Sequence, residues 1–189
     1  MFQDMVHILM THFIFSLLYA PLVFILLKFY NVQIIAILLF STSLIWLFLI
    51  KDKKDLMTLF PLFYLFIALC AFVLDTFLFL KMIPLFIAIF YALVILISYF
   101  QDGSFIMKFA EKISQNPIDK KEQQYIHHST LFWFFVSMIN VLIHVYLYMN
   151  RDLGLWVYYS SFGWYIVFAI AGMFQFLHRH YIFLGKKNV

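Results

Sequence analysis

Six apolar runs, each about as long as a membrane-spanning helix, constrain this 189-residue chain most strongly. They lie at about 8–27, 32–50, 56–74, 82–100, 130–149 and 155–178. About 20 apolar residues in an α-helix cross a hydrocarbon core that is about 30 Å thick. Because lipid offers no partner to backbone polar groups, such runs fold as helices. The sequence therefore predicts an all-α polytopic membrane protein, a bundle of about six transmembrane helices forming a single integral membrane domain over 1–189.

The stretch 56–100 needs separate treatment, because only Asp75 and Lys81 interrupt its apolar residues. One continuous helix of that length would measure ~67 Å, about twice the hydrocarbon thickness. We therefore expect two spans joined by a short turn with Asp75 and Lys81 at its ends. Similarly, the segment Arg151-Asp152-Leu153-Gly154 predicts a tight turn between the fifth and sixth runs, with glycine supplying the permissive backbone.

Composition indicates that lipid is the main solvent of the chain. Hydrophobic residues make up 66% and charged residues 12% of it, against about 45–50% and about 25% in soluble domains. The only cysteine, Cys70, excludes a disulfide within the chain and a paired-cysteine metal site. The first apolar run lacks the basic flank and cleavage site of a signal peptide, so we expect it to be retained as an anchor.

Lysine and arginine residues predict the orientation. With six spans, one side carries ten of the 13 basic residues, and the other carries Lys28, Lys81 and Arg151. Because cytoplasmic loops hold the excess of basic residues, we expect both termini to be cytoplasmic. The net charge of +4 is explained by this orientation and by contact with anionic lipid, so we expect no nucleic-acid partner.

Segment 101–128 is the only sizeable piece outside the predicted spans. Its aromatic and basic residues recur at helical spacing on opposite sides, which is typical of an amphipathic helix on a membrane surface. We therefore expect one cytoplasmic interfacial helix here. Its candidate contact residues are Phe105, Lys108, Phe109 and Lys112.

Polar side chains interrupt the first, fifth and sixth runs on single helical faces. In the fifth run, Trp133, Ser137, Asn140 and His144 follow an i, i+4, i+7, i+11 pattern. The sixth run has a similar stripe, made of Ser161, Tyr165, Phe168, Gly172, Gln175 and Arg179. Unpaired polar groups are costly in lipid, so we expect these faces to turn toward one another. The candidate polar face comprises His12, Ser137, Asn140, His144, Tyr165, Gln175 and Arg179.

Two interpretations of this face stay open. Either its residues serve as interhelical hydrogen-bonding groups, each bond worth about 0.6 kcal/mol, or they line a substrate or proton pathway. No histidine, aspartate and glutamate combination has ligand spacing, so we expect no metal and no cofactor. Phosphate-loop, nucleophile-elbow and metalloprotease motifs are also missing from the sequence.

The second half of the chain resembles a known family. The resemblance rests on segments 79–112, 131–140 and 156–179, which contain a proline-led span, a Trp-x-x-Phe-Phe…Asn span and a Trp-x-x-Tyr…Tyr span. Matching positions are occupied by Pro84, Trp133, Asn140, Trp156, Tyr159, Tyr165 and Arg179. The pattern is similar to a family of small, uncharacterised bacterial inner-membrane proteins, often encoded beside fatty-acid-synthase-like or aryl-polyene genes. Here Ser160-Ser161 replaces Asn-Gly, and Gln175 replaces a glutamate.

This resemblance implies a multi-pass protein of the bacterial inner (plasma) membrane and a link to acyl-lipid or polyene assembly in the cell envelope. A weaker resemblance connects the aromatic spans to the septation protein A family. Neither family brings an enzyme activity. Partners implied are membrane lipids, membrane-associated acyl or polyene biosynthesis proteins, and a second copy of the chain.

Three functions are compatible with these patterns. The first is a non-enzymatic accessory or scaffold protein of the inner membrane, favoured by the short loops and the missing catalytic constellation. An alternative is a carrier or flippase-like protein for a lipidic molecule, using the candidate polar face. The second alternative is a membrane-embedded enzyme on an acyl or isoprenoid substrate, with His144 as base.

Overall fold

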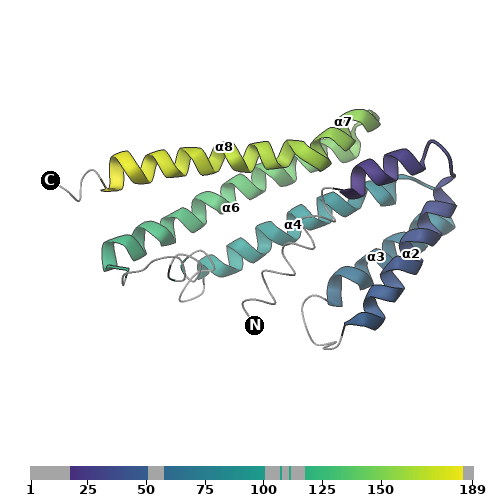
Figure 1. Ribbon diagram of the computed structural model, residues 1–189, viewed down its shortest axis with the longest axis horizontal. Coiled ribbons are helices and arrows are strands. Elements are labelled where there is room, and N and C mark those ends of the chain that lie inside the picture. The colour runs from purple at the N-terminus through teal and green to yellow at the C-terminus, as the bar shows by residue number, and fades with distance from the viewer. Residues whose placement is uncertain (1–17, 51–57, 101–106, 108–110, 112–117, 185–189) are drawn as a thin grey trace. The chain divides into compact units, whose positions relative to one another are not determined.

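The computed structural model describes residues 18–50, 58–100, 107, 111 and 118–184, and no strand occurs among them (Figure 1). The elements in chain order are a helix at 18–26, α2 (Val32–Leu49), α3 (Leu59–Leu74), α4 (Leu78–Phe100), α6 (Lys120–Met149), α7 (Leu153–Tyr158), the π-helical η2 (Tyr159–Gly163), α8 (Trp164–Leu177) and the π-helical η3 (His178–Leu184). The all-α part of the prediction is confirmed.

Four helical segments are long and apolar enough to cross a membrane. They are Val32–Leu49, Leu78–Phe100, Lys120–Met149 and the continuous stretch Leu153–Tyr181. Helix α3, with 16 residues, is about 24 Å long and falls short of the full hydrocarbon thickness. Many large apolar side chains on these helices are exposed, as expected for surfaces that face lipid. These features indicate a membrane protein, and the number of six spans stays a prediction.

The apolar stretch 56–100 breaks at Asp75. Helix α3 ends at Leu74, and Asp75 adopts a left-handed backbone with φ 45° and ψ 44°. A residue in this conformation stops the i→i−4 hydrogen-bond pattern, as at many helix C-termini. Helix α4 then begins at Leu78, so Lys81 lies in its first turn and not in the connection.

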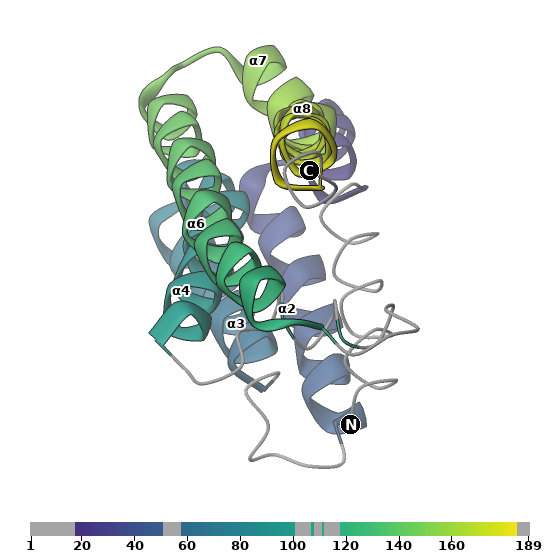
Figure 2. The ribbon, with the colours of Figure 1, turned by 90° about the vertical axis from the view of Figure 1, so that its left-hand side faces the viewer.

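Helix α6 is one uninterrupted helix of 30 residues and begins at Lys120, ahead of the predicted span 130–149 (Figure 2). Its start is set by Asp119, whose Oδ1 accepts a hydrogen bond from the backbone N–H of Glu122 at 2.8 Å. An aspartate at this position satisfies an N–H that has no partner within the helix. Residues 120–128, predicted as part of the segment between spans, therefore continue the fifth helix.

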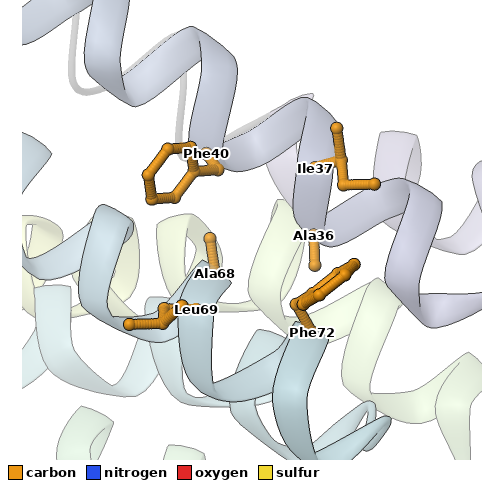
Figure 3. Close-up of a pocket in the computed structure, with 6 residues that line it drawn as sticks. All are labelled: Ala36, Ile37, Phe40, Ala68, Leu69 and Phe72. Carbon is orange, nitrogen blue, oxygen red and sulfur yellow. The ribbon is translucent and has the colours of Figure 1, made fainter.

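The described residues divide into two compact units. The first contains the chain up to Phe86 together with Leu147–Ser161, and the second contains Ile87–Tyr146 and the chain from Phe162 onward. In the first unit α2 packs along α3, where Ala36 and Ala68 let the backbones approach. Figure 3 shows the apolar groove of about 200 Å³ at this contact, flanked by the rings of Phe40 and Phe72.

The first unit also joins the start of α4 to the residues that follow α6. The Lys81 Nζ donates a hydrogen bond to the backbone carbonyl of Asn150 at 2.6 Å. Phe77, directly before α4, meets Trp156 edge-to-face, with ring centroids 5.4 Å apart. The predicted turn at 151–154 is shorter than expected, because Asp152 caps α7 and Gly154 lies inside that helix.

In the second unit α6 and α8 run antiparallel and pack along their aromatic faces. The rings of Trp133 and Phe168 stack with centroids 6.0 Å apart and an angle of 10°. Gly172, one turn further along α8, lies beside the same tryptophan, and a Cβ there would make an ordinary contact with its ring. The fifth- and sixth-run stripes proposed from the sequence therefore meet at this point.

Candidate functional site

A pocket of about 520 Å³ lies between the first turns of α6 and the last turns of α8 with η3, all within the second unit. We call it the α6–α8 pocket. Its lining residues are Tyr125, His128, Ser129, Phe132, Phe174, Gln175 and His178. The volume falls within the range of about 300–1,000 Å³ typical of small-molecule sites. Five lining residues are polar and two are phenylalanines, so the site suits a molecule with a polar and an apolar part.

The α6 wall of the pocket follows directly from the helix that Asp119 starts. Tyr125, His128, Ser129 and Phe132 are spaced i, i+3, i+4 and i+7, so they share one face of α6. Their order along the helix separates the polar groups from the phenylalanine. The polar groups lie toward the helix N-terminus, and Phe132 lies about 10 Å beyond Tyr125 along the helix axis.

Beside the opposite wall, the π-helical winding of η3 sets which rings contact Tyr125. The Tyr125 ring stacks on His178, with centroids 5.8 Å apart, and on Phe183, with centroids 4.6 Å apart. Residues five apart align in a π-helix, whose hydrogen bonds join i to i+5, but not in an α-helix. The change of winding at His178 therefore brings both rings onto the same tyrosine. Local π-helical turns are frequent at functional sites.

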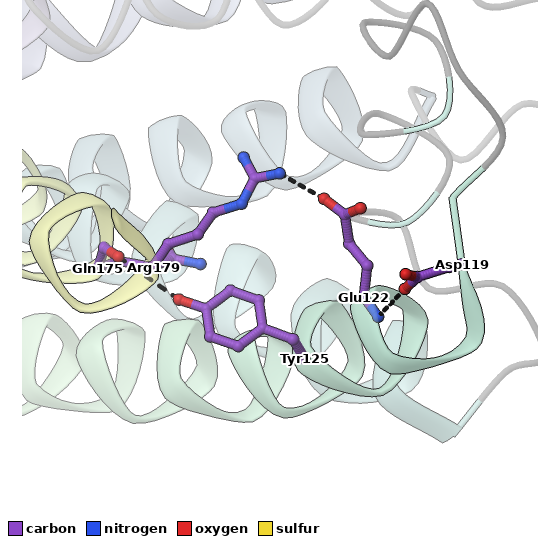
Figure 4. Close-up of polar contacts among 5 residues, drawn as sticks. All are labelled: Asp119, Glu122, Tyr125, Gln175 and Arg179. Atoms are coloured by element: carbon purple, nitrogen blue, oxygen red, sulfur yellow. Dashed lines mark hydrogen bonds and ion pairs between the residues drawn. The ribbon is translucent and has the colours of Figure 1, made fainter. Parts of the chain in front are cut away.

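Hydrogen bonds and an ion pair hold the polar end of the pocket together (Figure 4). The Tyr125 hydroxyl donates to the Gln175 carbonyl at 3.4 Å and lies 3.3 Å from Nδ1 of His178. Beside them, the Arg179 guanidinium forms an ion pair with the Glu122 carboxylate. Because Arg179 is about half exposed, this pair contributes little to stability. It fixes the position of Arg179 next to the pocket.

The structure brings two of the sequence-predicted site residues to this pocket. Gln175 lines it, and Arg179 lies at its edge through the pair with Glu122. Tyr165 is half-buried on α8 and does not line it. The predicted face therefore contributes to the pocket only through its C-terminal residues.

The remaining members of the predicted polar face lie further along α6. Ser137, Asn140 and His144 are all buried, and no hydrogen-bond partner for the Ser137 hydroxyl is found in the described part of the chain. His144 is 19 residues beyond Tyr125, which corresponds to about 28 Å along the helix axis. These three side chains therefore form a separate buried polar group and do not join Gln175 and Arg179.

Five candidate residues cannot be placed. His12, Phe105, Lys108, Phe109 and Lys112 lie outside the described residues. Within the ranges that the structure describes, no three histidine, cysteine, aspartate or glutamate side chains come together as metal ligands.

Sequence reasoning missed the α6 wall because it placed the start of the fifth helix too late. The signal was available in Asp119-Lys120-Lys121-Glu122, an N-cap residue followed three positions later by glutamate. The i, i+3, i+4, i+7 recurrence from Tyr125 to Phe132 was a second signal. His178 was missed for another reason, since a change to π-helical winding has no simple sequence pattern.

No protein-family model, curated protein or solved structure matches this chain. The two family resemblances noted from the sequence therefore stay predictions.

Proposed function

We propose that this protein is a non-enzymatic accessory protein of the bacterial inner membrane that holds an amphipathic, lipid-like molecule in the α6–α8 pocket. It has both termini in the cytoplasm, so the pocket lies at the cytoplasmic side. In this role it supports acyl-lipid or polyene assembly in the cell envelope. The proposal combines the accessory function expected from the sequence with a defined ligand site.

The observation that carries the proposal is the polarity of the pocket lining. Phe132 and Phe174 are 38% and 63% exposed, so this part of the pocket opens to the surroundings of the helices, which are lipid in the proposed setting. The other lining residues offer hydroxyl, imidazole and amide groups. A lipid has the same division, with an apolar chain that stays in the hydrocarbon and a polar head at its edge.

Native mass spectrometry of the protein purified in mild detergent tests this proposal, with an absorption spectrum of the same sample. We expect a stoichiometric co-purifying lipid or polyene. The double variant Phe132→Ser/Phe174→Ser removes the apolar contacts of the pocket and should lose the bound molecule. A wild-type protein that carries no such molecule, even after incubation with a membrane lipid extract, would contradict the proposal.

A matched control is available on the same two helices. Phe135 and Phe176 are 58% and 66% exposed and do not line the pocket. The double variant Phe135→Ser/Phe176→Ser therefore removes a similar apolar surface but should keep the bound molecule. Equal loss in both double variants would show that the molecule is a general annular lipid.

A carrier for a lipidic molecule is the second candidate function, and the buried group Ser137, Asn140 and His144 favours it. Polar side chains within a membrane helix often mark a transport path. Reconstituted protein should then accelerate the flipping of a fluorescent lipid, and His144→Gln should abolish the acceleration. An accessory protein shows no flipping and tolerates the substitution.

A further inference from the structure

The polar lining of the α6–α8 pocket consists mainly of hydrogen-bond donors. Each imidazole of His128 and His178 carries at least one N–H in every protonation state, and Gln175 carries an amide NH2 group. The Tyr125 hydroxyl already donates to the Gln175 carbonyl, and Ser129 is hydrogen-bonded to Tyr125. No aspartate or glutamate lines the pocket. A set of donors without a carboxylate favours a ligand group that is rich in acceptor oxygens.

The acidic side chains close to the pocket are already engaged. The Glu122 carboxylate pairs with Arg179, and the Asp119 carboxylate caps the first turn of α6. Lys120 and Lys121 on that turn are exposed, and the turn holds no acidic residue other than Asp119 and Glu122. Arg179, Lys120 and Lys121 carry three positive charges, and the two carboxylates carry two negative charges. The net charge at the polar end of the pocket is therefore positive.

Polarity changes along the pocket in one direction. Tyr125, His128 and His178 lie at the end where Arg179 is found, and Phe132 and Phe174 lie toward the middle of the helices. A negatively charged head and an apolar chain joined in one molecule would match both ends at once. A soluble anion would use only the first end.

We propose that the ligand of the α6–α8 pocket is an anionic amphiphile, a single molecule with an apolar chain and a carboxylate or phosphate head. The head is held by His128 and His178, and the chain lies against Phe132 and Phe174. This inference rests on the proposed function and adds the chemical class of the ligand to it.

Competition between paired probes tests the charge of the head. Full-length protein in detergent is incubated with oleate and oleyl alcohol, or with lysophosphatidate and lysophosphatidylcholine, and the bound species are counted by native mass spectrometry. We expect the anionic member of each pair to bind at least about tenfold better, since charge-assisted hydrogen bonds are roughly twice as strong as neutral ones. The double variant His128→Phe/His178→Phe keeps a flat ring at each position but removes its N–H donors. It should lose most of this preference and keep its binding of oleyl alcohol.

The control is His180→Phe, a substitution in η3 of a histidine that stacks on Phe176 and does not line the pocket. It should keep the wild-type preference. Helical content measured by circular dichroism shows that each variant is folded, so a lost preference is not a lost fold.

The possible results separate the two proposals. Equal binding of anionic and neutral probes, lost together in Phe132→Ser/Phe174→Ser, overturns the anionic head and leaves the proposed function intact. A preference that persists in His128→Phe/His178→Phe also overturns the assignment of the head group. Inorganic phosphate that displaces lysophosphatidate at equal concentration overturns the role of the chain. Failure of every probe to bind overturns both proposals.

Discussion

The ammonium group of Lys81 donates a hydrogen bond to the backbone carbonyl of Asn150 at 2.6 Å, and its side chain is only 3% exposed. Asn150 directly follows the last residue of α6, where helix carbonyls have no partner within the helix. A cation at this end also interacts favourably with the helix dipole. Lys81, which the sequence predicts at the end of a turn, therefore connects the first turn of α4 to the end of α6.

Replacing Lys81 by methionine should destabilise the protein by about 1–3 kcal/mol, because a hydrogen bond from a charged donor is lost in a buried position. The loss is measured as a shift of the unfolding transition in sodium dodecyl sulfate, followed by circular dichroism. The matched variant Lys28→Met removes an exposed lysine that lies over the Phe24 ring, 4.9 Å from its centroid, in the same unit. It should cost about 0.5–1 kcal/mol. A Lys81→Met protein as stable as Lys28→Met would contradict the structural role of Lys81.

The Arg179–Glu122 ion pair should contribute about 0.2–1 kcal/mol, since Arg179 is about half exposed. A double-mutant cycle with Arg179→Gln and Glu122→Gln measures the coupling between the two side chains. Thermal unfolding in a neutral detergent at low and high salt provides the readout. The coupling should shrink at high salt because exposed charges are screened. A large coupling that is independent of salt would mean that the pair is desolvated.

Gly154 and Gly172 should respond differently to substitution by alanine. A Cβ at Gly172 would lie 3.7 Å from the Trp133 ring, an ordinary contact, so the better helix propensity of alanine should stabilise α8 by up to ~1 kcal/mol. A Cβ at Gly154 would lie 3.2 Å from Oδ1 of Asp152, which caps α7 by accepting from the Leu155 N–H at 3.1 Å. Disturbing this cap costs about 1 kcal/mol. Unfolding in sodium dodecyl sulfate should therefore rank Gly172→Ala above Gly154→Ala, and the reverse order would contradict the prediction.

Much of the architecture follows from the lengths of the apolar runs alone. Runs of about 20 apolar residues predict the long helices, and Asp75 correctly marks the break between α3 and α4. What the runs do not show is where a helix continues beyond the apolar residues. Helix α6 starts at Lys120 because Asp119 caps it, although the first turns are polar.

The residues of the α6–α8 pocket were harder to predict from the sequence for the same physical reason. Gln175 and Arg179 were found because polar residues in an apolar run stand out, whereas Tyr125 and His128 were assigned to a connecting segment. The meeting of Trp133 with Phe168 follows from the predicted stripes, since residues on one helical face can contact one partner helix. The stacking of Tyr125 on both His178 and Phe183 needs the π-helical winding of η3, which depends on tertiary packing.

Asp75 holds a left-handed backbone conformation, and its substitution tests how much strain the α3–α4 connection contains. Glycine adopts φ 45° without a steric penalty, so Asp75→Gly should leave stability unchanged or raise it by up to ~1 kcal/mol. Valine pays the full penalty of a β-branched side chain, and Asp75→Val should cost about 1–2 kcal/mol. The difference between the two variants, measured by unfolding in sodium dodecyl sulfate, is independent of the lost carboxylate. Equal stability of both would show that the connection relaxes to another conformation.

Cysteine labelling tests the proposed orientation, because opposite ends of α6 should face opposite sides of the membrane. With Cys70 replaced by alanine, the variants Arg151→Cys and Lys121→Cys place one exposed cysteine just after and near the start of α6. A 30-residue helix is about 45 Å long, enough to separate its ends by the whole bilayer. A membrane-impermeant maleimide added to intact spheroplasts should label Arg151→Cys and reach Lys121→Cys only after permeabilisation. The opposite labelling would place the α6–α8 pocket on the outer side, and labelling of both from outside would mean that α6 does not span the membrane.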